Sequence, residues 1–197
     1  MSVDYWNHNT AYHKWLIDIA SQHRGTVLDV GCGDGLLAQR LSPVSTFVTA
    51  IEPDANAAAR AAARLASLDN VAVVDADFDA YQSDGARFDL ITFVASLHHM
   101  DMRSALTKAR ELLTPTGEIA VVGLSANKSA TDWLWALACL PVNRIASRLH
   151  GETRDIGVVV TDPQECLSEI RRTVDDVLPG AQITRGLYYR YLLRWRR

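Results

Sequence analysis

The chain has 197 residues, which is enough for one α/β domain at roughly 150 residues per domain. Hydrophobic residues make up 48% of it and charged residues 22%, which is ordinary for a soluble globular protein. The net charge of −3 gives no general attraction to nucleic acid or to an anionic membrane, so neither is expected as a partner.

Cysteine usage predicts a reducing, cytoplasmic environment. The three cysteines, Cys32, Cys139 and Cys166, are odd in number and lack the spacing of a metal site, so we expect neither a disulfide framework nor a bound metal. The polar and aromatic N-terminus shows no signal peptide. The most apolar later run, residues 133–142, is too short to span a bilayer and contains Pro141.

Residues 1–24 predict a helical segment that covers one face of the core. Its apolar side chains recur at roughly helical spacing: Tyr5, Trp6, Tyr12, Trp15, Leu16 and Ile19. Polar residues lie among these aromatics, including His13 beside Tyr12. Most of the segment is therefore expected to pack as an amphipathic helix.

Residues 26–37 predict a buried strand, a glycine-rich turn and the start of a helix. The strand Thr26–Val30 is rich in β-favouring residues, and Gly31, Gly33 and Gly35 follow it at every second position. Glycine has no Cβ and tolerates positive φ, so a ligand can approach this backbone closely. A carboxylate in the strand, Asp29, needs partners if it is buried, and a polar or cationic ligand would be one.

Two further strands are expected at 47–51 and 71–74, each followed by an acidic loop. Glu52 lies 17 residues after Gly35, close to the offset at which an acid of a nucleotide-binding unit accepts hydrogen bonds from ribose hydroxyls. The second loop offers three competing carboxylates, namely Asp75, Asp77 and Asp79.

The run Phe88–Val94 predicts a central parallel strand, because it is almost continuously apolar. His98 and His99 follow at its carboxyl end, where open α/β sheets place their sites, and a helix is expected over 103–113. Two adjacent histidines alone are a weak metal signal. Either of them can serve as a general base, because imidazole titrates near neutrality.

The rest of the chain predicts a turn at 113–118, a fifth strand at 119–123 and a helix-like stretch at 129–149. A helix is expected to start within 161–165 and to run to about residue 177, followed by strands at 181–183 and 187–195. The arginines near the C-terminus favour a solvated strand edge over a nucleic-acid patch.

The segment Asp-Val-Gly-Cys-Gly-Asp-Gly at 29–35 resembles the first motif of class I S-adenosylmethionine-dependent methyltransferases. Leu-His-His at 97–99 and the Pro-Thr-Gly turn at 115–117 are similar to later family segments, and the resemblance is strong over residues 26–123. An NAD-binding fingerprint would carry its third glycine at position 36, which is Leu36 here.

The resemblance implies a single Rossmann-like α/β domain, a three-layer αβα sandwich whose seven-stranded sheet is mostly parallel with an antiparallel last strand. Its expected parts are an N-terminal cap (1–24), a cofactor-binding core (25–123), a helical substrate or cap region (124–178) and a terminal hairpin (179–197). The chain is expected to be a monomer or a homodimer.

The resemblance also implies a set of residues that contact S-adenosylmethionine. Asp77 would accept from the adenine amine, Phe78 and Pro53 would lie along the adenine ring, and Tyr12 would touch the cofactor as the N-terminal segment closes over it. The complete expected set is Tyr12, Asp29, Gly31, Cys32, Gly33, Glu52, Pro53, Asp77, Phe78, Val94 and Ala95.

The predicted activity is transfer of a methyl group from S-adenosylmethionine to an oxygen, nitrogen or carbon nucleophile of a small molecule. A hydroxyl acceptor would need a base, for which His13, His98 and His99 are the candidates, whereas positioning alone can suffice for a neutral amine. Two alternatives stay open: a regulatory protein that binds the cofactor without methyl transfer, and an NAD(P)-dependent oxidoreductase, which Leu36 disfavours.

Overall fold

A seven-stranded sheet forms the centre of the computed structural model, which describes residues 4–128, 133–135, 137, 139, 141, 148, 153, 161–188 and 190–197. The strand order is β3-β2-β1-β4-β5-β7-β6, and β7 runs antiparallel to both of its neighbours. This confirms the predicted mostly parallel sheet with an antiparallel last strand. The strands are β1 (Thr26–Val30), β2 (Phe47–Glu52), β3 (Val71–Asp75), β4 (Phe88–Val94), β5 (Leu113–Leu124), β6 (Gln182–Arg185) and β7 (Arg190–Arg196).

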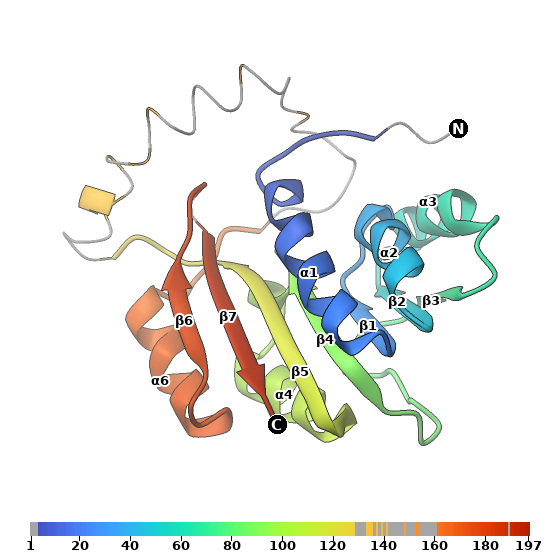
Figure 1. Cartoon of the computed structure of the whole chain (residues 1–197). Helices are drawn as coiled ribbons and strands as arrows, with labels where there is room; N and C mark the ends of the chain where they lie inside the picture. The colour runs from blue at the N-terminus through green and yellow to red at the C-terminus, as the bar shows by residue number, and fades with distance from the viewer. Residues whose placement is uncertain are drawn as a thin grey trace.

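Helices cover both faces of the sheet, as Figure 1 shows. One face carries α1, α2 and α3, and the other carries α4 and α6. A short 3₁₀ turn, η1 (Thr10–Tyr12), leads into α1, and another, η3 (Leu97–His99), follows β4. The helices are α1 (His13–His23), α2 (Leu36–Leu41), α3 (Ala55–Leu65), α4 (Met102–Leu112) and α6 (Leu167–Val177).

Alternating side chains of the central strands divide the core into two apolar layers. On β1, Val27 belongs to the layer under α1 and α2, whereas Leu28 belongs to the layer under α4 and α6. Their register partners on β4 follow the same alternation, with Leu90 beside Val27 and Ile91 beside Leu28. The near-continuous apolar character of these strands therefore reflects burial on both faces.

The point at which the strand order reverses lies at β1, which pairs with β2 on one side and with β4 on the other. In open α/β sheets, ligands bind outside the carboxyl ends of the strands at such a switch point. The glycine turn at residues 31–35 directly follows β1. The fold therefore places this turn where a ligand site is expected.

The helix predicted to begin within 161–165 begins instead at Leu167. Its N-cap is Cys166, which shares a capping box with Glu169, and residues 161–164 carry no regular structure. The backbone N–H of Ala126 donates to the Glu165 carbonyl at 2.8 Å. This contact and the bridge between Ala126 and Cys166 pair the approach to α6 with the chain leaving β5 in an extended conformation.

The C-terminal arginines are engaged within the fold, and the predicted solvated strand edge is wrong, because β7 pairs with β5 on one side and with β6 on the other. Arg194 pairs with the buried carboxylate of Glu118, which also lies 3.2 Å from Nε2 of His23. Arg197 donates to the carbonyls of Arg110 and Leu113.

The stretch predicted as helical over 129–149 lies mostly outside the described residues. Within the described part of the chain, no helix combines the length and apolar character needed to cross a membrane.

Candidate cofactor site

The glycine turn after β1 has a backbone that only glycine adopts without strain. Gly31, Gly33 and Gly35 have φ values of +73°, +59° and +80°. The N–H groups of Gly31 and Cys32 both donate to the Ile51 carbonyl at 2.9 Å, which ties the turn to β2. All three glycines are therefore favoured by backbone geometry at the entrance to the site.

The loop that follows β4 packs against this turn from the other side. A Cβ on Gly31 would collide with Cβ of Ser96, whose hydroxyl donates to the Val30 carbonyl. Ala95 adopts a left-handed conformation (φ 53°) and donates its N–H to the Val122 carbonyl at 2.8 Å. The predicted contact residues Val94 and Ala95 thus lie, half-buried, beside the glycine turn.

Asp29 is a buried carboxylate with one free oxygen. It is 1% exposed, and the hydroxyl of Thr92, its register partner on β4, donates to Oδ1 at 2.8 Å. Oδ2 has no hydrogen-bond partner among the described residues. Burial, with a smaller contribution from the charge of Glu52, raises the pKa of Asp29 to about 7, against the effect of the Thr92 hydroxyl.

Glu52 ends β2 with its carboxylate against the glycine turn. It is 5% exposed; Oε2 accepts from the N–H of Gly33 at 2.8 Å and Oε1 from the N–H of Asp54 at 3.1 Å. An ionised carboxylate has about four lone-pair sites, so two acceptor positions remain. The structure therefore brings Glu52 and Asp29 to the two sides of one turn, as the sequence predicts.

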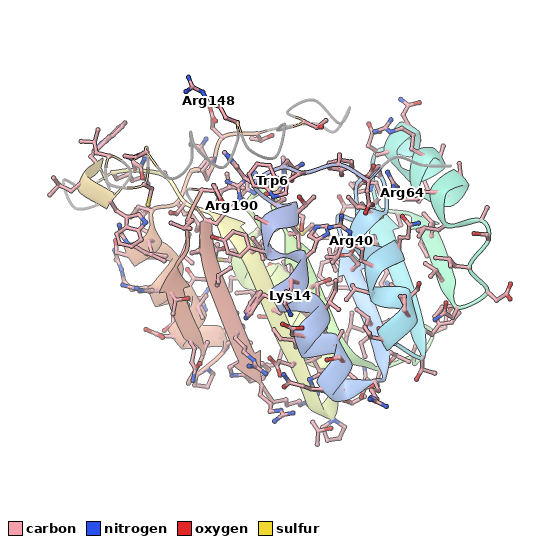
Figure 2. The ribbon with its side chains drawn as sticks, turned by 45° about the horizontal axis from the view of Figure 1, so that its top comes forward. Trp6, Lys14, Arg40, Arg64, Arg148 and Arg190 are labelled. Carbon is pink, nitrogen blue, oxygen red and sulfur yellow. The ribbon has the colours of Figure 1, made fainter. Side chains whose placement is uncertain are left out.

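A buried ion pair fixes the far side of the glycine turn. Arg64 of α3 pairs with Oδ2 of Asp34 at 2.6 Å and also donates to the Asp34 carbonyl at 2.9 Å. Tyr5 donates to Oδ1 of Asp34 at 3.0 Å, and burial raises the pKa of this phenol. The N-terminal segment is thereby anchored to the turn, and Figure 2 shows Arg64 beside α2 at this edge.

The residues predicted to contact the adenine differ in their exposure in the structure. Asp77 and Pro53 are exposed at the ends of their strands, and Oδ1 of Asp77 accepts the N–H of Asp79 at 2.8 Å. Phe78 is only 1% exposed and meets Phe93 edge-on at 5.7 Å between ring centroids. The predicted stacking role of Phe78 is therefore not supported, because its apolar ring is used in the core.

His13 is also enclosed by packing. It is buried at the start of α1, and Nη1 of Arg40 lies 3.1 Å from its Nδ1. Burial, followed by the charge of Arg40, lowers the pKa of His13 to about 3, so the ring stays neutral. The structure thus does not favour His13 as the base, because the guanidinium of Arg40 occupies its Nδ1.

Tyr12 is directed toward the turn between β6 and β7. Its hydroxyl donates to the Leu187 carbonyl at 2.9 Å. Burial raises its pKa to about 12. The residue that was predicted to touch the cofactor therefore joins the N-terminal segment to the C-terminal hairpin.

An aromatic cluster, formed by Trp6, His8, Tyr12 and Tyr188, covers the end of that hairpin. The ring of Tyr188 stacks on His8 at 4.6 Å and meets Trp6 edge-on at 5.8 Å. Arg190 donates from Nε and Nη2 to the side-chain oxygen of Asn9, at 2.9 and 2.7 Å. Figure 2 shows Trp6 and Arg190 close together above the carboxyl ends of the strands.

His98 and His99 lie in η3, at the carboxyl end of β4, with ring centroids 4.2 Å apart. Nε2 of His98 is 3.0 Å from the carbonyl oxygen of Thr161, whereas the His99 side chain is exposed. The two candidate bases therefore differ in how firmly they are held.

Four residues that support the site were absent from the predicted set: Thr92, Ser96, Asp34 and Arg64. Thr92 interrupts the apolar run that follows Asp89 in this strand, and this break in the pattern is a signal that could have identified it. Arg64 gives no such signal, since it is one of two arginines in an alanine-rich helix and its partner lies 30 residues away.

The hydrogen-bond acceptors of the site fit a cationic nucleoside. Two carboxylates beside a glycine-rich turn suit a ligand that brings positive charge to Asp29 and ribose hydroxyls to Glu52. A dinucleotide site would need a glycine at position 36, where the side chain of Leu36 is buried in the core.

Comparison with known proteins agrees with this assignment. Residues 28–119 match a family model described as a methyltransferase domain. An uncharacterized methyltransferase of Mycobacterium tuberculosis (strain ATCC 25618 / H37Rv) is 38% identical over 192 residues, covering 97% of this chain and 96% of the relative. A ubiquinone biosynthesis O-methyltransferase of Pectobacterium atrosepticum is 28% identical over 174 residues, covering 84% of this chain and 66% of the relative.

Solved structures share the fold at lower identity. The N-methyltransferase NodS from Bradyrhizobium japonicum WM9, in complex with S-adenosyl-L-homocysteine, superposes with a TM-score of 0.65 at 19% identity, covering 97% of this chain and 88% of NodS. A methyltransferase from Aquifex aeolicus gives a TM-score of 0.62 at 18% identity, covering 93% of this chain and 87% of the other.

Proposed function

The chain belongs to the class I S-adenosylmethionine-dependent methyltransferases, and from this premise we propose that it methylates a nucleophile of a small molecule. The cofactor supplies an electrophilic methyl group on a sulfonium, so the demanding chemistry belongs to the cofactor. The protein has to bind it, align the acceptor with the methyl–sulfur bond and keep water away.

The observation that carries this proposal is the buried Oδ2 of Asp29 beside the glycine turn, which has no hydrogen-bond partner in the described part of the chain. A buried acceptor without a donor is costly, and a cationic group at this place removes the cost. Glu52, held by the N–H groups of Gly33 and Asp54, would accept from the ribose hydroxyls with its remaining lone pairs. Gly31, Cys32 and Gly33 would let the ligand approach the backbone.

The acceptor atom is an oxygen, a nitrogen or a carbon of a small molecule. Several relatives named ubiquinone biosynthesis O-methyltransferase, at 28–32% identity, favour oxygen among the three. The net charge of −3 favours a small molecule over a nucleic acid. A cytoplasmic location remains a prediction that rests on three free cysteines, Cys32, Cys139 and Cys166.

Isothermal titration calorimetry tests the cofactor assignment directly. We expect S-adenosylmethionine to bind and NAD not to bind. Glu52→Ala should weaken binding by about 1–3 kcal/mol, because charge-assisted hydrogen bonds to the ribose are lost. Glu111→Ala, which removes an exposed carboxylate on α4, is the matched control.

The outcome that would contradict the proposal is tight binding of NAD without binding of S-adenosylmethionine. An unchanged dissociation constant in Glu52→Ala would remove Glu52 from the ribose role and leave the family assignment intact.

A further inference from the structure

The side chain of His98 is held in one tautomer. Its Nε2 lies 3.0 Å from the Thr161 carbonyl oxygen, which can only accept a hydrogen bond. Nε2 must therefore carry the proton in the neutral ring, and Nδ1 must present an unprotonated lone pair. A backbone carbonyl that orients an imidazole in this way leaves the second nitrogen available as a base.

That second nitrogen is buried and unsatisfied. Nδ1 of His98 has no hydrogen-bond partner among the described residues. A buried acceptor without a donor is costly, so a bound molecule that brings an O–H or N–H to this atom removes that cost. A carboxylate at the same place would meet a lone pair and be repelled.

Burial and the neighbouring groups of His98 keep its ring neutral. The groups that act on it are His99 on the same 3₁₀ turn, Arg190 at the start of β7 and the Thr161 carbonyl before α6. Burial is the largest effect, and together with His99 and Arg190 it lowers the pKa of His98 to about 4, while the Thr161 carbonyl opposes it. The base form is thus present throughout the physiological pH range.

We propose that His98 is the catalytic base of this enzyme and that the acceptor is a hydroxyl compound, whose O–H donates to Nδ1. This assignment rests on the proposed function, because it concerns the same methyl transfer. It also selects among the candidates: His99 is exposed, and no hydrogen bond from the described residues fixes its tautomer, whereas the Nδ1 of His13 faces the guanidinium of Arg40.

The proton balance of the step follows from this geometry. The acceptor oxygen forms a bond to the methyl carbon, the carbon–sulfur bond breaks with its electron pair going to sulfur, and the hydroxyl proton moves to Nδ1. The oxygen becomes strongly acidic as it gains the methyl group, so a base with a pKa near 4 is sufficient to take the proton. The protonated ring then loses the proton to solvent at neutral pH.

Histidine-selective ¹⁵N NMR tests the tautomer without any acceptor. We expect the His98 ring to show a protonated Nε2 and an unprotonated Nδ1 from pH 5 to pH 8, with the signal assigned through His98→Gln. Adding catechol to protein saturated with S-adenosyl-L-homocysteine should then move the Nδ1 signal of His98. A protonated Nδ1, or an Nδ1 signal that catechol does not move, overturns the proposal.

Turnover with catechol provides the functional test. In His98→Gln the side-chain amide can still donate to Thr161, but it has no basic nitrogen. We expect the rate to fall by about 10²–10⁴-fold and to rise with pH, because solvent must now remove the proton, whereas the parent rate stays level from pH 6 to pH 8. Calorimetry should show that His98→Gln still binds S-adenosylmethionine.

The matched variant His99→Gln tests the competing base. A larger loss in His99→Gln than in His98→Gln overturns the assignment, as does a His98→Gln rate within a few-fold of the parent rate. If the parent fails to bind S-adenosylmethionine, the proposed function itself is wrong. If it binds the cofactor and the His98 variant behaves like the parent, only the base assignment is wrong.

Discussion

The proposed cofactor side and the proposed acceptor side of the site are built in different ways. On the cofactor side, the glycine turn, Asp29 and Glu52 are joined by backbone hydrogen bonds and strand register, and the turn and Glu52 lie only 19 residues apart. On the acceptor side, His98 is held by a carbonyl 63 residues away, and the N-terminal segment contacts the terminal hairpin across 175 residues.

This difference separates a part of the site that forms locally from a part that needs the whole fold. The cofactor side depends on backbone atoms, glycines and two carboxylates, so its geometry follows once the central strands pair. The acceptor side depends on side chains from the N-terminal segment, η3 and the terminal hairpin, whose relative placement requires the whole fold. Substrate choice can therefore change without disturbing the glycine turn, Asp29 and Glu52.

The largest expected effect comes from adding a methyl group to the glycine turn. Gly31→Ala combines a left-handed φ of +73° with a collision at Ser96, so we expect a loss of about 2–5 kcal/mol in the free energy of unfolding and little cofactor binding. Gly85→Ala is the control, since its φ is +86° and no atom lies within 4 Å of the added Cβ. Denaturant titration should show a loss of only about 1–2 kcal/mol there. Equal losses in the two variants would show that contact with Ser96 adds nothing to the backbone strain at Gly31.

The next effect concerns the charge of the Asp29 carboxylate beside the glycine turn. In Asp29→Asn we expect S-adenosylmethionine binding to weaken by about 10–100-fold, because a hydrogen bond from a cationic group to a carboxylate is lost. In the parent, affinity should increase as pH rises toward 7 and then level off, since the raised pKa of about 7 means that a proton must leave before the cation binds. Calorimetry across this range measures both, and an affinity independent of pH would contradict the assigned charge state.

The same carboxylate predicts how stability depends on pH. A folded-state pKa of about 7, above the unfolded value of 3.8, means that the folded protein holds this proton more tightly. The free energy of unfolding of the ligand-free parent should therefore fall between about pH 4 and pH 7 through this group and stay level above it. Asp29→Asn should remove this component of the slope in denaturant titrations.

Much of the cofactor side could be predicted from sequence, because its information is local. The strand, the glycine spacing and the acid at the end of the next strand all lie within residues 26–52, and the structure brings Asp29 and Glu52 to one turn. The position of the Phe78 side chain could not be predicted in this way, because a sequence does not show whether an aromatic side chain after a strand turns toward a ligand or into the core.

The acceptor side was less predictable for a physical reason. The choice between His98 and His99 depends on the position of the Thr161 carbonyl, and no pattern in residues 97–99 contains that information. The early helix start within 161–165 was wrong for the same reason, since the contact between Ala126 and Glu165 is long-range. Such contacts override local propensity.

A smaller effect is expected where the two termini meet on the acceptor side. Tyr12→Phe removes the hydrogen bond to the Leu187 carbonyl, so we expect the free energy of unfolding to fall by about 1 kcal/mol. Calorimetry with S-adenosylmethionine on the same variant tests the original prediction for this residue. A loss of affinity without a loss of stability would show that the hydroxyl serves the cofactor and not the hairpin.

The smallest effect is expected at Ala95, where the two sides of the site join. Its left-handed φ of 53° costs about 1–2 kcal/mol for a residue with a Cβ, so Ala95→Gly relieves strain in the folded state while it adds freedom to the unfolded chain. We expect a net gain of up to about 1 kcal/mol in the free energy of unfolding. Ala59→Gly, on the exposed side of α3, should instead lose about 1 kcal/mol. Opposite signs for the same substitution would show that strain is stored in the loop between the cofactor and His98, whereas equal losses would show that the loop holds none.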